Sequence, residues 1–407
     1  MAKLKIGVWL IGARGGVAST ALVGLCALKK GLAGEAGLVS QLPEFRQIGL
    51  ADWGDFVAAG HEIRSVRLVD EAMRMAADNR AIDPGLIAQC AGELEEIDRR
   101  VRLGTMHRVG PTIGRLASPE VPVGEPPREA IRRLQADWSQ FARHEGLEHV
   151  IVVNVASTEP VVDPALLPRT WAELDRTLDL PDECPLPASS LYAIAALDLG
   201  CSYVNFTPSL GSAPEAIDEL ARQRGTRHMG CDGKTGETLL KSVLAPMFRA
   251  RGLGVMSWVG HNIFGNLDSK VLDDPANKKA KLASKDRLLA EILGYKPQTL
   301  VSLEHVESLG DWKTAWDHVH FRGFLGTPMT LQFIWQGCDS LLAAPLVLDL
   351  VRFTELARQR GQVGRMTFLA SFFKSPYGVT EHDFTRQFQM LETWAGAGGA
   401  PRSTAPA

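Results

Sequence analysis

Residues 5–18 read KIGVWLIGARGGVA, and this stretch decides the fold. Its first seven residues form a mainly apolar run, which is typical of a buried strand. The run ends at Gly12 in a glycine-rich turn, and an apolar helix is expected from Thr20 to Lys30. A strand, a glycine turn and a helix in this order predict the start of a nucleotide-binding α/β domain.

The glycine turn at residues 12–18 suits a pyrophosphate. Glycines let the backbone approach a ligand closely, and the N-terminus of the following helix favours negative charge. The turn departs from the G-x-G-x-x-G template, because Arg14 and Val17 occupy its second and third glycine positions. A tight turn without a ligand is the alternative, and the strand–helix context favours a dinucleotide.

Further along the chain, helices and strands continue to alternate. Helices are expected over residues 84–101 and 128–144, and the apolar run 150–153 is typical of a central parallel strand. The pattern changes after Thr238, where a helix interrupted by Pro246 precedes strand-like runs near residues 255–259, 299–307 and 329–335. Apolar helices return over 341–360 and 366–373. The sequence thus predicts an α/β nucleotide-binding domain with an inserted second domain.

Composition narrows the class of protein. A chain of 407 residues is too long for one compact core, so two domains are expected. The formal net charge of −3 gives no broad footprint for nucleic acid or an anionic membrane. The six cysteines form no C-x-x-C pair, and no apolar stretch reaches membrane-spanning length. We therefore expect a soluble, cytoplasmic protein that binds neither nucleic acid nor membrane.

Polar residues that follow two predicted strands are candidates for cofactor contacts. Glu62 follows a strand-like run and could bind an adenosine ribose, although an exposed helix-capping carboxylate is the simpler interpretation. The run from Asn154 to Pro160 follows the buried strand 150–153 and so falls at the sheet edge where ligands gather. Helix capping by Ser157 or Thr158 is the alternative there.

The turn at residues 232–238 opens a long helix and is a candidate anion site. Its small residues leave N–H groups free at a helix start, and Lys234 and Thr235 could add hydrogen bonds. A capping box formed by Thr235 and Thr238 would explain the same residues without a ligand.

Lysines supply the remaining candidates. Lys278, Lys281 and Lys285 share one helical face, which is typical of a solvated surface or, alternatively, of a cationic pocket for a phosphorylated substrate. Lys374 ends a predicted apolar helix, where burial would lower its pKa toward neutrality. Lys313 is unremarkable in isolation. The histidines lack metal-ligand spacing, and no G-x-S-x-G or H-E-x-x-H motif supports a hydrolase.

Taken together and in order, these motifs resemble the inositol-3-phosphate synthases (myo-inositol-1-phosphate synthases), especially their shorter prokaryotic forms. The resemblance runs from about Lys5 to about Tyr377. The motifs that carry it are the loop 12–20, GHEI at 60–63, the run 150–159, YVNFTPS at 203–209, DGKTG at 232–236, GNLD at 265–268, Lys281 with Lys285, GDWK at 310–313 and DSLLAAPL at 339–346.

The resemblance implies an architecture and a reaction. It implies a Rossmann-like NAD-binding domain at residues 1–238 plus 339–394 and an inserted α+β catalytic and tetramerisation domain at 239–338. The composition of residues 395–407, mostly Gly, Ala, Pro, Ser and Thr, separately predicts a disordered tail. The implied reaction converts glucose 6-phosphate into 1D-myo-inositol 3-phosphate. NAD⁺ oxidises C5, a C6 proton is removed, C6 attacks the C1 aldehyde, and NADH reduces the ring ketone. The implied assembly is a homotetramer.

The resemblance also assigns residues. Lys281 and Lys374 are implied in proton transfer and oxyanion stabilisation, and Lys285 and Lys313 in holding the phosphate. Asp232 and Asp339 are implied in orienting lysines or substrate hydroxyls. The implied substrate-binding residues are Thr235, Gly236, Asn266 and Asp268. The implied cofactor-binding residues are Gly12, Gly15, Gly16, Val17, Ala18, Glu62, Ala156, Ser157 and Thr158. A divalent metal is possible, with Asp232, Asp268 and Asp339 as oxygen ligands.

Departures from the family pattern motivate alternatives. Leu267 and Trp312 stand where family members have asparagine and a small residue, which motivates the alternative of a related NAD-dependent cyclase acting on another hexose phosphate, such as a ketose phosphate. A third hypothesis is a catalytically silent NAD-binding or metabolite-sensing protein. The presence of all four lysines argues against it, because a protein that only binds NAD needs no proton transfer.

Overall fold

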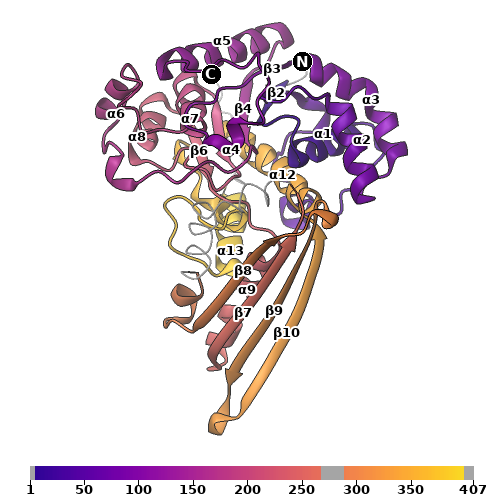
Figure 1. Cartoon of the computed structure of the whole chain (residues 1–407), viewed down its shortest axis with the longest axis vertical. Helices are drawn as coiled ribbons and strands as arrows, with labels where there is room; N and C mark the ends of the chain where they lie inside the picture. Colours follow the sequence, from indigo (N-terminus) through magenta and orange to yellow (C-terminus); the bar gives the residue numbers. More distant parts are fainter. Residues whose placement is uncertain (1–4, 267–287, 398–407) are drawn as a thin grey trace, which may run out of the picture.

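A parallel sheet forms the upper part of the molecule in Figure 1. The computed structural model describes residues 5–266 and 288–397. Seven strands lie in the order β11-β6-β5-β4-β1-β2-β3, and each pairs in parallel with its neighbours. Their bounds are β1 Ile6–Ile11, β2 Phe56–Glu62, β3 Val101–Leu103, β4 His149–Asn154, β5 Ser202–Asn205, β6 Arg227–Gly230 and β11 Gly364–Arg365. The predicted run at 150–153 is therefore the middle strand, and the predicted parallel α/β fold is confirmed.

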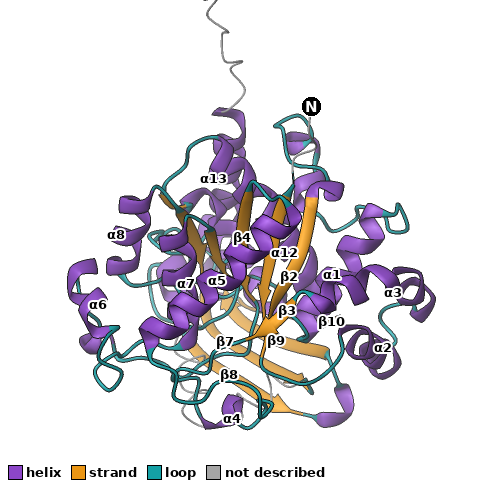
Figure 2. Ribbon diagram, turned by 90° about the horizontal axis from the view of Figure 1, so that it is seen from above, coloured by secondary structure: helices purple, strands orange, loops and turns teal. Residues whose placement is uncertain are grey.

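Helices cover both faces of this sheet (Figure 2). One face packs against α1 Gly16–Lys29, α2 Leu68–Asn79, α3 Pro84–Arg99, α12 Asp339–Gln359 and α13 Phe384–Ala397. The other packs against α5 Pro127–Glu145, α6 Trp171–Thr177, α7 Ala188–Leu199 and α8 Glu215–Arg224. Val8 and Leu10 of β1 enter the first core, and Trp9 and Ile11 enter the second. This alternation follows from the strand's two-residue period and explains why β1 is apolar throughout.

A second sheet extends downward in Figure 1, with the β9–β10 hairpin reaching farthest from the first sheet. Its order is β10-β9-β7-β8, with bounds β7 Gly254–Phe264, β8 Gln298–His305, β9 Trp312–Arg322 and β10 Pro328–Cys338. The helix α9 Gly236–Ala250 packs Phe248 against Trp258 of β7 and the buried Val319 of β9. The chain then passes from Cys338 directly into α12 and completes the first sheet with β11. The division into two domains at these residues remains a prediction.

Several expected element bounds were wrong. The first helix starts at Gly16, with Gly15 as its N-cap, four residues earlier than expected. Pro246 lies inside an unbroken α9, and the segment expected as a helix over 366–373 is a 3-10 helix at Thr367–Phe372. The helix α13 continues through Ala397, beyond the expected start of the tail. Shorter elements lie at α4 Pro111–Gly114 and in 3-10 turns at Val39–Gln41, Pro43–Phe45, Trp53–Asp55, Pro164–Leu166, Glu307–Leu309 and Phe324–Gly326.

Gly12→Ala tests the turn after β1. Gly12 has a φ of 80°, and an added Cβ would lie 2.9 Å from the Ala156 Cα. We expect the free energy of unfolding to fall by about 1–3 kcal/mol, because the new methyl group strains both segments. Urea unfolding measures this. Gly92→Ala is the control: it lies in α3 with open space around it, so it should gain about 0.5–1 kcal/mol. Equal stability of the Gly12 variant and wild type would contradict this account of the turn.

Candidate functional site

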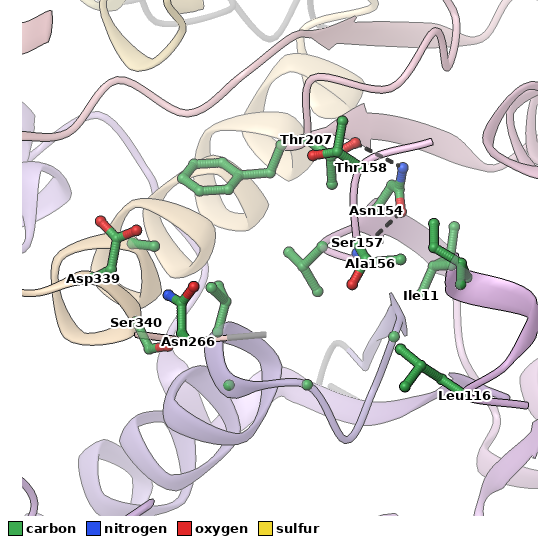
Figure 3. A pocket seen from close by; sticks show the side chains of 18 of the residues that line it. Ile11, Leu116, Asn154, Ala156, Ser157, Thr158, Thr207, Asn266, Asp339 and Ser340 are labelled. Atoms are coloured by element: carbon green, nitrogen blue, oxygen red, sulfur yellow. Dashed lines mark hydrogen bonds between the residues drawn. The ribbon is translucent and has the colours of Figure 1, made fainter. Parts of the chain in front are cut away.

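A cavity of about 400 Å³ opens at the carboxyl ends of β1 and β4. The strand order changes direction at this point, because β2 continues the chain on one side of β1 and β4 lies on the other. Ligands of open α/β sheets bind at such a switch point. Figure 3 shows Ala156 and Ser157 on one side of the cavity and Asn266, Asp339 and Ser340 on the other.

The glycine turn forms one wall. Gly12, Gly15, Gly16 and Val17 line the cavity. An added Cβ at Gly16 would lie 2.7 Å from the Ser340 Oγ, so only glycine allows this close approach. No side chain caps the N-terminus of α1, which leaves its first N–H groups available to an anion. The wall therefore fits the pyrophosphate of a dinucleotide.

Glu62 ends β2 beside this turn and is buried. Its carboxylate accepts backbone N–H bonds from Arg14 at 2.9 Å, Ile63 at 2.8 Å and Arg64 at 3.1 Å. The interpretation as an exposed helix cap was therefore wrong. Glu62 lines the cavity at the position where this fold meets the adenosine ribose.

The segment after β4 forms the adjoining wall. Ala156, Ser157 and Thr158 line the cavity, and no helix begins there, so helix capping does not explain them. Asn154 holds the segment: its Oδ1 accepts the Ala156 N–H at 3.2 Å, and its amide donates to Thr207 Oγ1 at 3.2 Å (Figure 3).

Lys374 and Asp232 form an ion pair in the same cavity. Their side chains meet at 2.8 Å, and both line the cavity. Burial acts to lower the pKa of Lys374, but attraction and hydrogen bonding from Asp232, with Asp339 and Glu237 farther away, raise it overall. The expected lowered pKa was therefore wrong, because the sequence did not reveal the carboxylate partner. Lys374 is protonated at neutral pH.

A second lysine comes from the other sheet. The Lys313 Nζ lies 3.7 Å from the Asp339 Oδ2 and 4.9 Å from the centre of the Phe264 ring. Lys313 is the second residue of β9 and Asp339 is the first residue of α12, so the junction of the two sheets places this pair in the cavity.

Thr235 and Asn266 also line the cavity, as Lys313 does. Thr235 is the N-cap of α9, but its side chain makes no capping bond, so the proposed capping box is absent and the hydroxyl can face a ligand. The Asn266 amide donates to Asp311 Oδ1 at 3.0 Å. The other Asp311 oxygen accepts the Ser340 N–H at 2.8 Å, which ties Asn266 to the start of α12.

Some predicted residues lie elsewhere. Ala18 and Gly236 do not line the cavity. Lys234 points into the core toward Gln387 of α13, and burial lowers its pKa to about 7. Trp312 donates its indole N–H to the Asn79 carbonyl at 2.7 Å and does not line the cavity. Five positions named from the sequence lie outside the described residues: Leu267, Asp268, Lys278, Lys281 and Lys285.

Glu159 belongs to the run from Asn154 to Pro160 that the sequence placed at the ligand edge of the sheet, but it was not named as a site residue. It lines the cavity, is buried, and accepts the Ser189 N–H at 2.8 Å. Burial raises its pKa to about 7, against hydrogen bonds from Ser189 and Ser209. A carboxylate directly after the polar end of a buried strand was the available signal. Among the described residues, no group of three or more histidine, cysteine or acidic side chains is arranged to hold a metal.

The fold and the site define the class: an NAD-dependent enzyme built on a Rossmann-like sheet. The class agrees with known proteins. A family model described as myo-inositol-1-phosphate synthase matches residues 6–395. Inositol-3-phosphate synthase 1 of Bacteroides thetaiotaomicron is 31% identical over 95% of this chain and 94% of its own length. The chain belongs to the myo-inositol-1-phosphate synthase family, and both the resemblance and the NAD cofactor predicted from the sequence are confirmed.

Other relatives differ in length or share only the fold. Human inositol-3-phosphate synthase 1 is 32% identical over 75% of this chain. The match covers 55% of the human protein, so this chain spans about half of its length. The crystal structure of inositol-3-phosphate synthase from Caenorhabditis elegans has a TM-score of 0.85, with 24% identity over 100% of this chain and 90% of that one. The crystal structure of a myo-inositol-1-phosphate synthase-related protein from Thermotoga maritima has a TM-score of 0.78 and 23% identity. The match covers 96% of this chain and 98% of that one. No helix among the described residues is long and apolar enough to cross a membrane.

Glu159→Gln tests the buried carboxyl. Because the pKa rises from its ordinary 4.5 to about 7 on folding, wild type loses stability as pH rises through this window. The variant lacks that loss, so its stability relative to wild type should increase by up to about 3 kcal/mol between pH 4.5 and pH 8. Urea unfolding across this range measures the difference. A difference between the two proteins that does not change with pH would contradict the assignment.

Proposed function

We propose that the protein cyclises glucose 6-phosphate to 1D-myo-inositol 3-phosphate in an NAD-dependent reaction. The observation that carries the proposal is the opening of two lysine–aspartate pairs into the cavity that contains the glycine turn. The full-length bacterial relative is named for this synthase activity, and the family match covers nearly the whole chain.

Gly12, Gly15, Gly16, Glu62 and the segment at 156–158 would hold the dinucleotide. When bound, NAD⁺ accepts a hydride from C5 of the sugar and later returns it, so the reaction needs no second redox partner. The chain's own lysines must then manage the charge that develops on the substrate.

Lys374 is suited to stabilise an oxyanion. A ketone at C5 acidifies the C6 protons, and their removal places negative charge on the carbonyl oxygen. Asp232 keeps the Lys374 ammonium charged and oriented, so it can donate a hydrogen bond or proton to that oxygen without reorganisation. A protonated Lys374 cannot be the base that removes the C6 proton. We assign that role to Lys281, which lies outside the described residues.

The phosphate would occupy the wall formed by Lys313, Thr235 and Asn266. Lys313 supplies a positive charge that Asp339 orients, and Thr235 places its hydroxyl at the N-terminus of α9. A helix N-terminus attracts anions through its free N–H groups and dipole. We assign Lys285 and Asp268 to the same end of the substrate.

A related cyclase acting on another hexose phosphate is the alternative. Trp312 was one reason for it, but its indole N–H donates to the Asn79 carbonyl and Trp312 does not line the cavity. The alternative now rests on Leu267 alone. For a silent NAD-binding protein, the paired lysines would have no function.

The product assay tests the proposal. Purified protein with NAD⁺ and glucose 6-phosphate should form an inositol phosphate, identified by NMR, without net accumulation of NADH. Parallel reactions contain a ketose phosphate, and each is run with and without a chelator, which tests the divalent metal. Product from the ketose phosphate alone would support the alternative, and product from no sugar phosphate would contradict cyclase activity.

Lys374→Ala and Lys281→Ala test the lysine roles. Each should lower kcat by at least about 100-fold, because oxyanion stabilisation or proton transfer is lost. NAD⁺ affinity should change by less than about twofold. Lys296→Ala removes an exposed lysine and is the matched control. Normal turnover by both site variants would show that the site is misplaced.

We also propose that the protein is a cytoplasmic homotetramer whose contacts involve residues 239–338. Exposed apolar side chains on this part of the chain support the proposal: Leu300 is 56% exposed and Ile334 is 69% exposed. Light scattering on the purified protein should give about four times the chain mass of 44.2 kDa. A monomeric mass would contradict it.

A further inference from the structure

A cluster of charged side chains surrounds the carboxyl end of β2, where the cavity meets the adenosine half of a dinucleotide. Glu62, Arg64, Glu71 and Arg74 all line the cavity. The side chain of Glu62 is 4% exposed and that of Arg64 is 16% exposed. Their charges are therefore poorly screened by solvent, and each strongly affects what can bind beside it.

The Glu62 carboxylate has little remaining capacity for a ligand. One oxygen accepts two backbone N–H bonds, from Ile63 at 2.8 Å and Arg64 at 3.1 Å. The other accepts the Arg14 N–H at 2.9 Å, which leaves one lone pair on that oxygen. The Arg64 guanidinium approaches this same oxygen at 3.4 Å. A ribose hydroxyl and Arg64 therefore compete for one acceptor position.

Arginines in this cluster are restrained by carboxylates. Arg64 lies between Glu62 and Glu71, at 3.4 Å and 4.0 Å. Arg14 pairs with Asp98 at 2.7 Å, and Arg74 pairs with Glu71 and Asp78, each at 2.7 Å. Three guanidinium groups thus face four carboxylates, and the cluster has a net formal charge of −1.

This balance determines which dinucleotide fits. In the dinucleotide-binding fold, an acidic residue at this strand end binds the ribose 2′-hydroxyl of NAD, whereas a nearby arginine accommodates the 2′-phosphate of NADP. Here both residue types are present within two positions of each other. A 2′-phosphate would meet the Glu62 charge directly, and like charges at close range repel.

We propose that Glu62 and Arg64 form the cofactor-selecting pair, in which Glu62 excludes a 2′-phosphate and holds Arg64 away from it. Loss of the Glu62 charge leaves the Arg64 guanidinium with the Arg14 carbonyl and the more distant Glu71 as its partners, so its charge becomes available to a 2′-phosphate at the adenosine end. Glu62 has a second task, because it anchors the glycine turn through the Arg14 N–H. The Glu62 side chain thus both selects NAD and holds the shape of the glycine turn.

Dissociation constants for NAD⁺ and NADP⁺, measured by calorimetry, test this pair without requiring turnover. Wild type should prefer NAD⁺. Glu62→Gln keeps the side-chain shape and removes its charge, so the ratio of the NADP⁺ to the NAD⁺ dissociation constant should fall by at least about tenfold. Adenosine 2′,5′-bisphosphate and 5′-AMP, measured in the same way, isolate the adenosine end and should show the same shift.

The double variant Glu62→Gln with Arg64→Gln separates charge selection from loosening of the turn. The proposal requires Arg64, so the double variant should lose most of the gain in NADP⁺ affinity. Glu95→Gln is the matched control: it neutralises an exposed carboxylate that pairs with Arg67 outside the cavity, and both constants should stay unchanged.

Two results would overturn the proposal: equal weakening of both dinucleotides by Glu62→Gln, or an NADP⁺ gain that survives in the double variant. Failure of wild type to bind either dinucleotide would also overturn it, by removing the cofactor site itself. Because binding alone is measured, failure of the cyclisation proposal would leave these results intact.

Discussion

The ion pair between Lys374 and Asp232 is the constraint on which the site depends. Three segments meet around it at the carboxyl edge of the parallel sheet. The Asp232 N–H donates to the Thr207 carbonyl at 3.0 Å, and the Lys374 N–H donates to the Asp232 carbonyl at 2.7 Å. These main-chain bonds hold both side chains where they meet. An ammonium buried beside a cofactor cavity would otherwise lose its proton, since burial alone favours the neutral form.

The second sheet supplies the other lysine of the site, and its position next to the first sheet makes this contact possible. The junction from β10 into α12 brings Asp339 to the cavity, and Asp339 in turn pairs with Lys313 of β9. Each lysine therefore has an aspartate partner on a different element, and the two pairs face one space. Fixed, paired cations of this kind stabilise developing negative charge without reorganising during the reaction.

The fold could be predicted from the sequence because buried strands and helices leave apolar patterns within a few neighbouring residues. The strands expected at residues 5–11 and 150–153 were identified by apolar continuity, and both lie at the centre of the sheet. The features that could not be predicted depend on partner residues that are distant in the sequence. The raised pKa of Lys374 comes from a residue 142 positions away, and Glu62 contacts Arg14 across 48 positions. Glu159 was not singled out within the run 154–160, because its contact with Ser189 of α7 is not visible in its local sequence.

A crystal structure with NAD⁺ and a hexitol 6-phosphate is the most direct test of the account. The hexitol lacks the aldehyde and therefore cannot close a ring. The account predicts its phosphate within hydrogen-bonding distance of Lys313, Thr235 and Asn266, with its C5 hydroxyl beside the Lys374 ammonium. A phosphate bound elsewhere, with Lys374 and Lys313 making no contact to the ligand, would contradict it.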